Sequence, residues 1–164
     1  MARERAPVVV GYDGSQLAQA AVRQVAELFS GRQTVLATVW EPQWAMVATP
    51  PADPLGTGVG IPPDPEMIET ADRAQLEHAS RIAEEGAELA RSLGLEAEPH
   101  VVPDEVNVAD TLIDVARERG AAAVVVGSHG RSDLRSLMLG SVSHKVVAHC
   151  DRPVVVVRGE RLSS

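Results

Sequence analysis

Residues 121–158 read AAAVVVGSHGRSDLRSLMLGSVSHKVVAHCDRPVVVVR, and this stretch decides which fold we expect. An apolar run, Ala122–Val126, stops abruptly at Gly127, and a second apolar run, Pro153–Val157, closes the stretch. Between them lie a glycine-spaced loop and a helix-like segment, Ser141–His149. The pattern predicts a buried strand, a loop with little side-chain bulk, a helix and a second buried strand.

The loop in this stretch is suited to an anion. Two residues separate Gly127 from Gly130, nine more precede Gly140, and the hydroxyl residue Ser141 follows. Glycines let main-chain N–H groups approach a phosphate, and the free N–H groups at a helix start favour negative charge. A glycine after a strand is by itself more often a turn than a site, so the combined spacing carries the prediction.

The rest of the chain repeats the alternation of strand and helix, which predicts a parallel sheet built from βαβ units. We expect strands over 7–12, 34–40, 95–102, 122–126 and 153–157, and helices over 15–31, 64–94, 105–118 and 141–149. The long helix should face the core along its whole length, through an apolar stripe made of Ile68, Ala71, Ala79, Ile82, Ala83, Gly86, Leu89, Ala90 and Leu93. Residues 1–164 thus form a single domain without internal repeats.

The segment 41–63 differs from the rest, with six prolines, three glycines and no clear periodicity. We expect a long flexible loop. Loops of this length inside a domain are uncommon and are usually functional or disordered. Two interpretations stay open: the loop closes over a ligand, or it is a mobile surface insertion.

Composition excludes several classes of protein. Hydrophobic residues make up 45% of the chain and aromatic residues only 2%, which favours a Val/Leu/Ile/Ala core under helices. The net charge of −8 argues against a nucleic-acid or an acidic membrane partner. The single cysteine, Cys150, permits no intrachain disulfide. Without a signal-peptide pattern, or an apolar run near the ~20 residues of a membrane span, we expect a cytoplasmic location.

The glycine spacing resembles the nucleotide-binding signature of the universal stress protein family, and the flanking segments GSHGR, LGSVS and RPVVVVR agree with it. The resemblance covers essentially the whole chain. It implies an open, doubly wound, five-stranded parallel sheet of the Rossmann-like, adenine nucleotide alpha hydrolase-like type, with strand order 3-2-1-4-5. It also implies an ATP-binding regulatory protein of stress adaptation, with Mg²⁺ as cofactor and a homodimer formed through the last strand, Pro153–Arg158.

In a sheet of that order the first and fourth strands face one crevice, where ligands of open parallel sheets bind. Twelve residues are candidates for the nucleotide site: Tyr12, Asp13, Gly14, Val39, Val126, Gly127, Gly130, Arg131, Gly140, Ser141, Val142 and Ser143. Asp13 is placed to hold ribose hydroxyls or a Mg²⁺ attached to the phosphates. The resemblance assigns Val39 and Val126 to the base or sugar, while the neighbouring Trp40 suits packing as well.

Each polar candidate also has a plainer interpretation. Asp13 precedes a glycine and would form a turn, and Arg131 could be a solvated loop residue. Ser141 and Ser143 would serve as helix caps. His129 lies in the loop, but the sequence supplies it with no identifiable Asp or Ser partner, so we assign no catalytic residue.

Other nucleotide motifs are missing from the sequence. There is no GxxxxGK[ST] run, and Lys145 is the only lysine, which excludes a P-loop NTPase. A GxGxxG motif after the first strand is also missing. Two alternatives to a regulatory ATP-binding protein remain: a slow ATPase or nucleotidyl-transfer enzyme on the same fold, and a nucleotide-free interaction protein.

Overall fold

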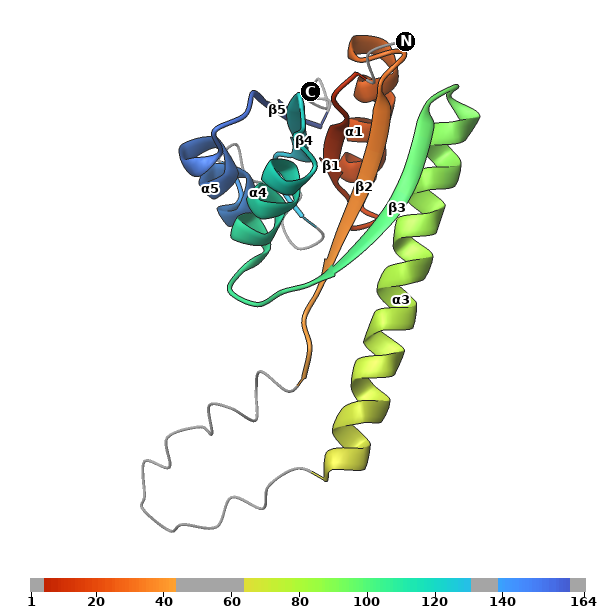
Figure 1. Cartoon of the computed structure of the whole chain (residues 1–164), viewed down its shortest axis with the longest axis vertical. Coiled ribbons are helices and arrows are strands. Elements are labelled where there is room, and N and C mark those ends of the chain that lie inside the picture. The colour runs from red at the N-terminus through yellow and green to blue at the C-terminus, as the bar shows by residue number, and fades with distance from the viewer. Residues whose placement is uncertain (1–4, 44–63, 131–138, 160–164) are drawn as a thin grey trace, which may run out of the picture.

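The computed structural model describes residues 5–43, 64–130 and 139–159. Five parallel strands form one sheet in the order β3-β2-β1-β4-β5, as predicted (Figure 1). Their bounds are β1 Val8–Gly11, β2 Gln33–Trp40, β3 Glu96–Pro103, β4 Ala123–Gly127 and β5 Val154–Val157. The central strand is β1, where Val8 is aligned with Thr34 of β2 on one side and Ala123 of β4 on the other.

The four helices of the described chain cover both faces of this sheet. They are α1 Gln16–Leu28, α3 Pro65–Ser92, α4 Val108–Glu118 and α5 Ser141–His149. Helices α1 and α3 pack with one core cluster, and α4 and α5 pack with a second cluster on the opposite face. The fold is therefore doubly wound, as the alternation of strand and helix predicted.

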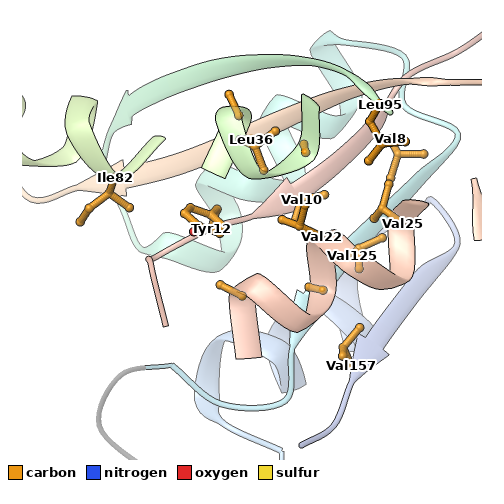
Figure 2. Packing of buried hydrophobic residues seen from close by; sticks show 14 residues of the cluster. Val8, Val10, Tyr12, Val22, Val25, Leu36, Ile82, Leu95, Val125 and Val157 are labelled. Carbon is orange, nitrogen blue, oxygen red and sulfur yellow. The ribbon is translucent and has the colours of Figure 1, made fainter. Parts of the chain in front are cut away.

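Alternation along β1 assigns its valines to the two faces. Val8 and Val10 join α1 and α3, while Val9 joins α4 and α5. All three are fully buried, and burying a valine side chain stabilises the fold by roughly 1.5–3 kcal/mol. Figure 2 shows the first cluster, with Tyr12 on the same side as Val8 and Val10. A short strand buried on both faces accounts for the continuous apolar run in the sequence.

Side-chain caps set where the helices begin. Ser15 accepts a hydrogen bond from the N–H of Ala18 at the start of α1. Asn107 accepts one from the N–H of Asp110, so α4 begins at Val108, later than the predicted residue 105. Asp64 accepts one from the N–H of Glu66, as the predicted start of the long helix required.

Helix α3 corrects one sequence-based expectation. Its stripe is buried only from Ala79 onward, whereas Ile68 and Ala71 are half-buried and Leu93 is 40% exposed. The 28 residues of α3 span about 42 Å at the usual helical rise, longer than the roughly 26 Å of an eight-residue strand. The first half of α3 therefore projects past the sheet (Figure 1).

The predicted long loop falls mostly on residues 44–63, outside the described part, so its two interpretations stay open. Across residues 5–43, 64–130 and 139–159, we find no helix with the length and apolar character needed to cross a membrane.

Candidate functional site

A pocket of about 410 Å³ lies at the carboxyl ends of β1 and β4, the point where the strand order reverses. It is lined by ten of the twelve candidate residues: Tyr12, Asp13, Val39, Val126, Gly127, Gly130, Gly140, Ser141, Val142 and Ser143. Gly14 is not in the lining, and Arg131 lies outside the described residues. The structure thus brings residues from both ends of the chain around one cavity.

Asp13 forms the turn that its position before glycine predicted. Its Oδ1 accepts a hydrogen bond from the N–H of Ser15 at 2.9 Å. Gly14 adopts φ +79°, a left-handed conformation that favours glycine. The other carboxylate oxygen, Oδ2, lies close to Gly130, 3.3 Å from where a β-carbon would be at that position. One oxygen of Asp13 thus holds the turn, and the carboxylate as a whole lies in the pocket lining.

Tyr12 sits at the end of β1 with its ring in the core. A β-carbon built on Gly86 of α3 would lie 2.7 Å from ring carbon Cε1, so only glycine fits beside the ring. Burial raises the pKa of the Tyr12 phenol, and the nearby carboxylates of Glu85 and Asp13 raise it further.

Two of the three signature glycines, Gly127 and Gly140, are required because the surrounding chain leaves no room for a β-carbon. None of the three is among the glycines with a positive φ. A β-carbon at Gly127 would lie 3.0 Å from Cβ of Leu17, and one at Gly140 would lie 3.2 Å from the carbonyl oxygen of Ser128. At these two positions the chain itself takes up the room. Gly130 differs, because its nearest neighbour is the carboxylate of Asp13, at 3.3 Å.

Ser128 ties the strand end to the start of α5. Its N–H donates to the carbonyl of Val157 at 2.8 Å, and its carbonyl accepts from the N–H of Gly140 at 2.7 Å. The buried hydroxyl of Ser143 donates to the same carbonyl at 2.9 Å and contacts the carbonyl oxygen of Gly140 at 3.0 Å. The predicted capping role of Ser143 is therefore wrong, because its single hydrogen is directed to main-chain carbonyls.

Helix α5 begins without a side-chain cap. Its N-cap is Gly140, no side chain of the described residues caps it by a hydrogen bond, and Ser141 is exposed. The first N–H groups of a helix have no partner within the helix. In α5 those of Ser141, Val142 and Ser143 lie on residues that line the pocket. This end of the pocket is therefore suited to an anion.

His129 has a partner that the sequence analysis missed. Its Nδ1 lies 3.0 Å from Oγ of the adjacent Ser128. Its Nε2 is buried and has no hydrogen-bond partner in the described part of the chain. Two adjacent residues do not form a recognisable dyad in sequence, so only the side-chain geometry reveals the pair.

The other end of the pocket is apolar. Val39 and Val126 are joined there by Ala37 and by two residues of α4, Val108 and Leu112. The α4 residues were not predicted as site residues, because their spacing is that of an ordinary core stripe. Such an end suits a flat, uncharged group such as a nucleobase.

Gly11 lines this apolar end, whereas Trp40 does not. A β-carbon at Gly11 would lie 3.0 Å from Leu112 and 3.2 Å from Val126, so glycine lets these walls approach each other. Trp40 is not in the lining, and its carbonyl accepts a hydrogen bond from the N–H of Asp104 at 2.7 Å. Trp40 is of intermediate burial, and a contact between its side chain and the pocket is not seen among the described residues.

A metal ion would find few protein ligands here. Within the described ranges no group of three or more His, Cys, Asp and Glu side chains could hold an ion. Among the residues that the structure describes, Asp13 is the one carboxylate in the lining. A single carboxylate fits Mg²⁺, which is usually held by one or two carboxylates together with substrate phosphates.

An open parallel sheet with a glycine-walled, anion-suited pocket at its switch point defines an α/β protein of the nucleotide-binding type. The model of the universal stress protein family matches residues 4–158, and the chain belongs to this family. It is 32% identical over 151 residues to universal stress protein YxiE of Bacillus subtilis, covering 92% of this chain and 97% of that protein.

Solved structures share the fold. Protein MJ0577 of Methanocaldococcus jannaschii superposes with a TM-score of 0.74 at 19% identity, covering 97% of this chain and 99% of that one. The universal stress protein from Archaeoglobus fulgidus in complex with dAMP gives 0.57 at 23% identity, with 94% and 99% covered.

Proposed function

We propose that this chain binds ATP together with Mg²⁺ in the pocket between β1 and β4 and acts as a regulatory protein of stress adaptation in the cytoplasm. The observation that carries the proposal is the uncapped start of α5 beside the signature glycines. Fold relatives in complex with dAMP, cAMP and AMP support an adenine nucleotide as ligand.

The two ends of the pocket suggest how the nucleotide would lie. The base would enter the apolar end between Val39 and Leu112. The phosphates would lie against Gly130 and the N–H groups at the start of α5, where the helix dipole favours negative charge. Asp13 would hold the Mg²⁺ through Oδ2, while Oδ1 keeps its bond to Ser15.

Isothermal titration calorimetry of the purified protein with ATP and Mg²⁺ tests the proposal, with GTP as the control for the base and AMP as the control for the phosphates. We expect ATP to bind and GTP to bind more weakly. Mass analysis of small molecules that stay with the gently purified protein gives a second, independent readout. Absence of adenine-nucleotide binding in both experiments would favour the nucleotide-free interaction protein.

The enzymatic alternative is tested separately. The Ser128–His129 pair is the one specific observation that favours it. A general base, however, must reach the proton that it removes, and Nε2 of His129 is buried. We therefore expect no multiple-turnover phosphate release at ordinary enzyme rates, which are about 1 per second or faster. Release at such rates would assign the chain to the ATPases.

The proposal includes a homodimer formed through β5. This strand is the last in the sheet order, and among the described residues no strand pairs with its outer edge. Val154, Val155 and Val156 are only half-buried within one chain. Unpaired edge groups together with apolar side chains favour association about a two-fold axis.

A further inference from the structure

We propose that Thr38 is a positioning residue of the nucleotide site, acting through Tyr12 on the wall that carries Asp13. The inference rests on the function proposed above. It adds to the nucleotide site a residue that does not itself line the pocket. The hydroxyl of Thr38 donates a buried hydrogen bond of 2.8 Å to the carbonyl of Tyr12. Thr38 itself does not line the pocket.

The bond lies where the strand pairing ends. Gly11 and Ala37 are the last aligned residues of β1 and β2. Tyr12 is one residue further, and its N–H still donates to the carbonyl of Ala37 at 2.9 Å. The Thr38 hydroxyl extends the connection by one more bond, from a side chain. It therefore fixes the chain just before Asp13, at the entrance of the turn.

Tyr12 is also held on the side of α3. Its ring packs beside Gly86, where a β-carbon would lie 2.7 Å away. With the ring confined by α3 and the main chain bonded to β2, Tyr12 has little freedom to shift. Asp13 follows directly, and its carboxylate reaches both Ser15 and the region of Gly130. The placement of this carboxylate thus depends on contacts made through Tyr12.

Thr34 provides a matched control on the same strand. Both threonines are buried, with 0% and 4% of their surface exposed for Thr34 and Thr38. They are four residues apart, so they face the same side of the sheet. The Thr34 hydroxyl, however, has no hydrogen-bond partner in the described chain. Replacing each by the isosteric valine removes the same atom, but only at position 38 does it break a bond to the site.

If the Tyr12–Asp13 segment is held less firmly, the arrangement that binds ATP is less populated, and the affinity for ATP falls. Loss of the donor leaves a buried carbonyl without its partner, and the apparent dissociation constant equals the intrinsic one divided by the binding-competent fraction. We expect Thr38→Val to weaken ATP binding by about tenfold. Thr38→Ser, which keeps the hydroxyl, should restore most of the affinity, and Thr34→Val should bind like the wild type.

The test combines calorimetry with amide hydrogen exchange followed by NMR. In Thr38→Val the amides of Tyr12 and Ser15 should exchange faster, while that of Val10 in the middle of β1 should not change. Leu95→Val, a core truncation at the opposite end of the sheet, controls for general destabilisation. If Thr38→Val does not fold, Thr38→Ala is measured in its place.

Equal ATP affinity of Thr38→Val and wild type would overturn the proposal. So would a loss of affinity no larger than that of Leu95→Val. If the wild type binds no adenine nucleotide, the proposed function fails, but the exchange measurement still decides the positioning role. Faster exchange at Ser15 in Thr38→Val and not in Thr34→Val supports it, and equal exchange in the two variants overturns it.

Discussion

Gly130 and Asp13 are close neighbours in the pocket lining: a β-carbon built on Gly130 would lie 3.3 Å from Oδ2 of Asp13. One residue belongs to the loop after β4 and the other to the turn after β1. The phosphates would lie beside this pair, against the N–H groups at the start of α5, with the Asp13 carboxylate placed to hold the Mg²⁺. Apart from the adjoining residues of the chain, Asp13 Oδ2 is the only atom of the described structure within 4 Å of that β-carbon, so a larger side chain at position 130 would crowd the carboxylate and the space beside it.

Gly130→Val should therefore weaken ATP binding by more than about tenfold and leave the thermal stability nearly unchanged, because Gly130 is exposed and has no positive φ. Gly120→Ala is the reciprocal control. Gly120 has φ +58° with nothing near its β-carbon position, so alanine should cost about 1–2 kcal/mol of stability and no affinity. Calorimetry and thermal unfolding measure both, and equal ATP affinity of Gly130→Val would place the phosphates elsewhere.

Asp13→Asn should remove the Mg²⁺ dependence of ATP binding. Asparagine keeps an oxygen for the N–H of Ser15, so the turn persists while the charge is lost. Mg²⁺ should raise the ATP affinity of the wild type, and we expect this gain to be about tenfold smaller in the variant. Changes around a metal site typically lower metal affinity by this order. Titrations with Mg²⁺ and with EDTA measure this gain. Asp110→Asn, at a half-buried carboxylate outside the pocket that is paired with Lys145, is the control and should leave the Mg²⁺ dependence of ATP binding unchanged.

The single tyrosine makes its ionisation directly measurable. Burial raises the pKa of Tyr12 above its ordinary value, so in the native protein tyrosinate absorbance should appear only above the usual midpoint of about 10. At a pH between the midpoint of the unfolded chain and that of the native protein, folded Tyr12 keeps a proton that the unfolded chain has released. Stability must fall as the pH rises from about 10 toward the native pKa. A native midpoint at or below the ordinary value would contradict the buried position of the ring.

Gly86→Ala should destabilise the fold although alanine is the better helix former. The methyl group would meet the ring of Tyr12 at 2.7 Å, and overpacking of a core costs about 1–3 kcal/mol, against a propensity gain of about 1 kcal/mol. Urea unfolding measures the net loss. In the Tyr12→Leu background the ring is gone, so Gly86→Ala should lower the free energy of unfolding by less than it does in the wild type. Additive losses in the double variant would show that the two positions do not interact.

Val156→Pro should convert the proposed dimer into a monomer. Hydrogen bonds from β4 reach the carbonyls of Pro153 and Val157, so the alternation of a parallel ladder directs Val155 toward β4 and Val156 outward. Proline at 156 removes an outward donor that a second copy would use. At 155 it would instead break the sheet and lower stability. Sedimentation at micromolar concentration decides: a wild-type monomer, or a Val156→Pro dimer, would contradict an interface at this edge.

Local sequence patterns were enough to predict the strands and helices of this protein and the candidate residues of its glycine-spaced loop. Continuous apolar runs identified strands buried on both faces, and capping residues such as Ser15 and Asp64 placed helix starts, because periodicity and caps act over a few residues. The strand order followed from the resemblance that the glycine spacing carries. Ten of the twelve candidate residues line the pocket for the same reason: each lies at or just after a strand end, or in the signature itself.

Tertiary structure alone decided how those residues are used. Leu112 became a pocket wall because the sheet order places α4 beside β1. Ser143 bonds the carbonyl of Ser128, and Thr38 that of Tyr12, through contacts between segments far apart in the chain. The first half of helix α3 projects past the sheet, because a helix of 28 residues is longer than the eight-residue strands that it packs against. Hydrogen-bond partners and packing depend on which segments meet in space, and a pattern within one segment does not contain that information.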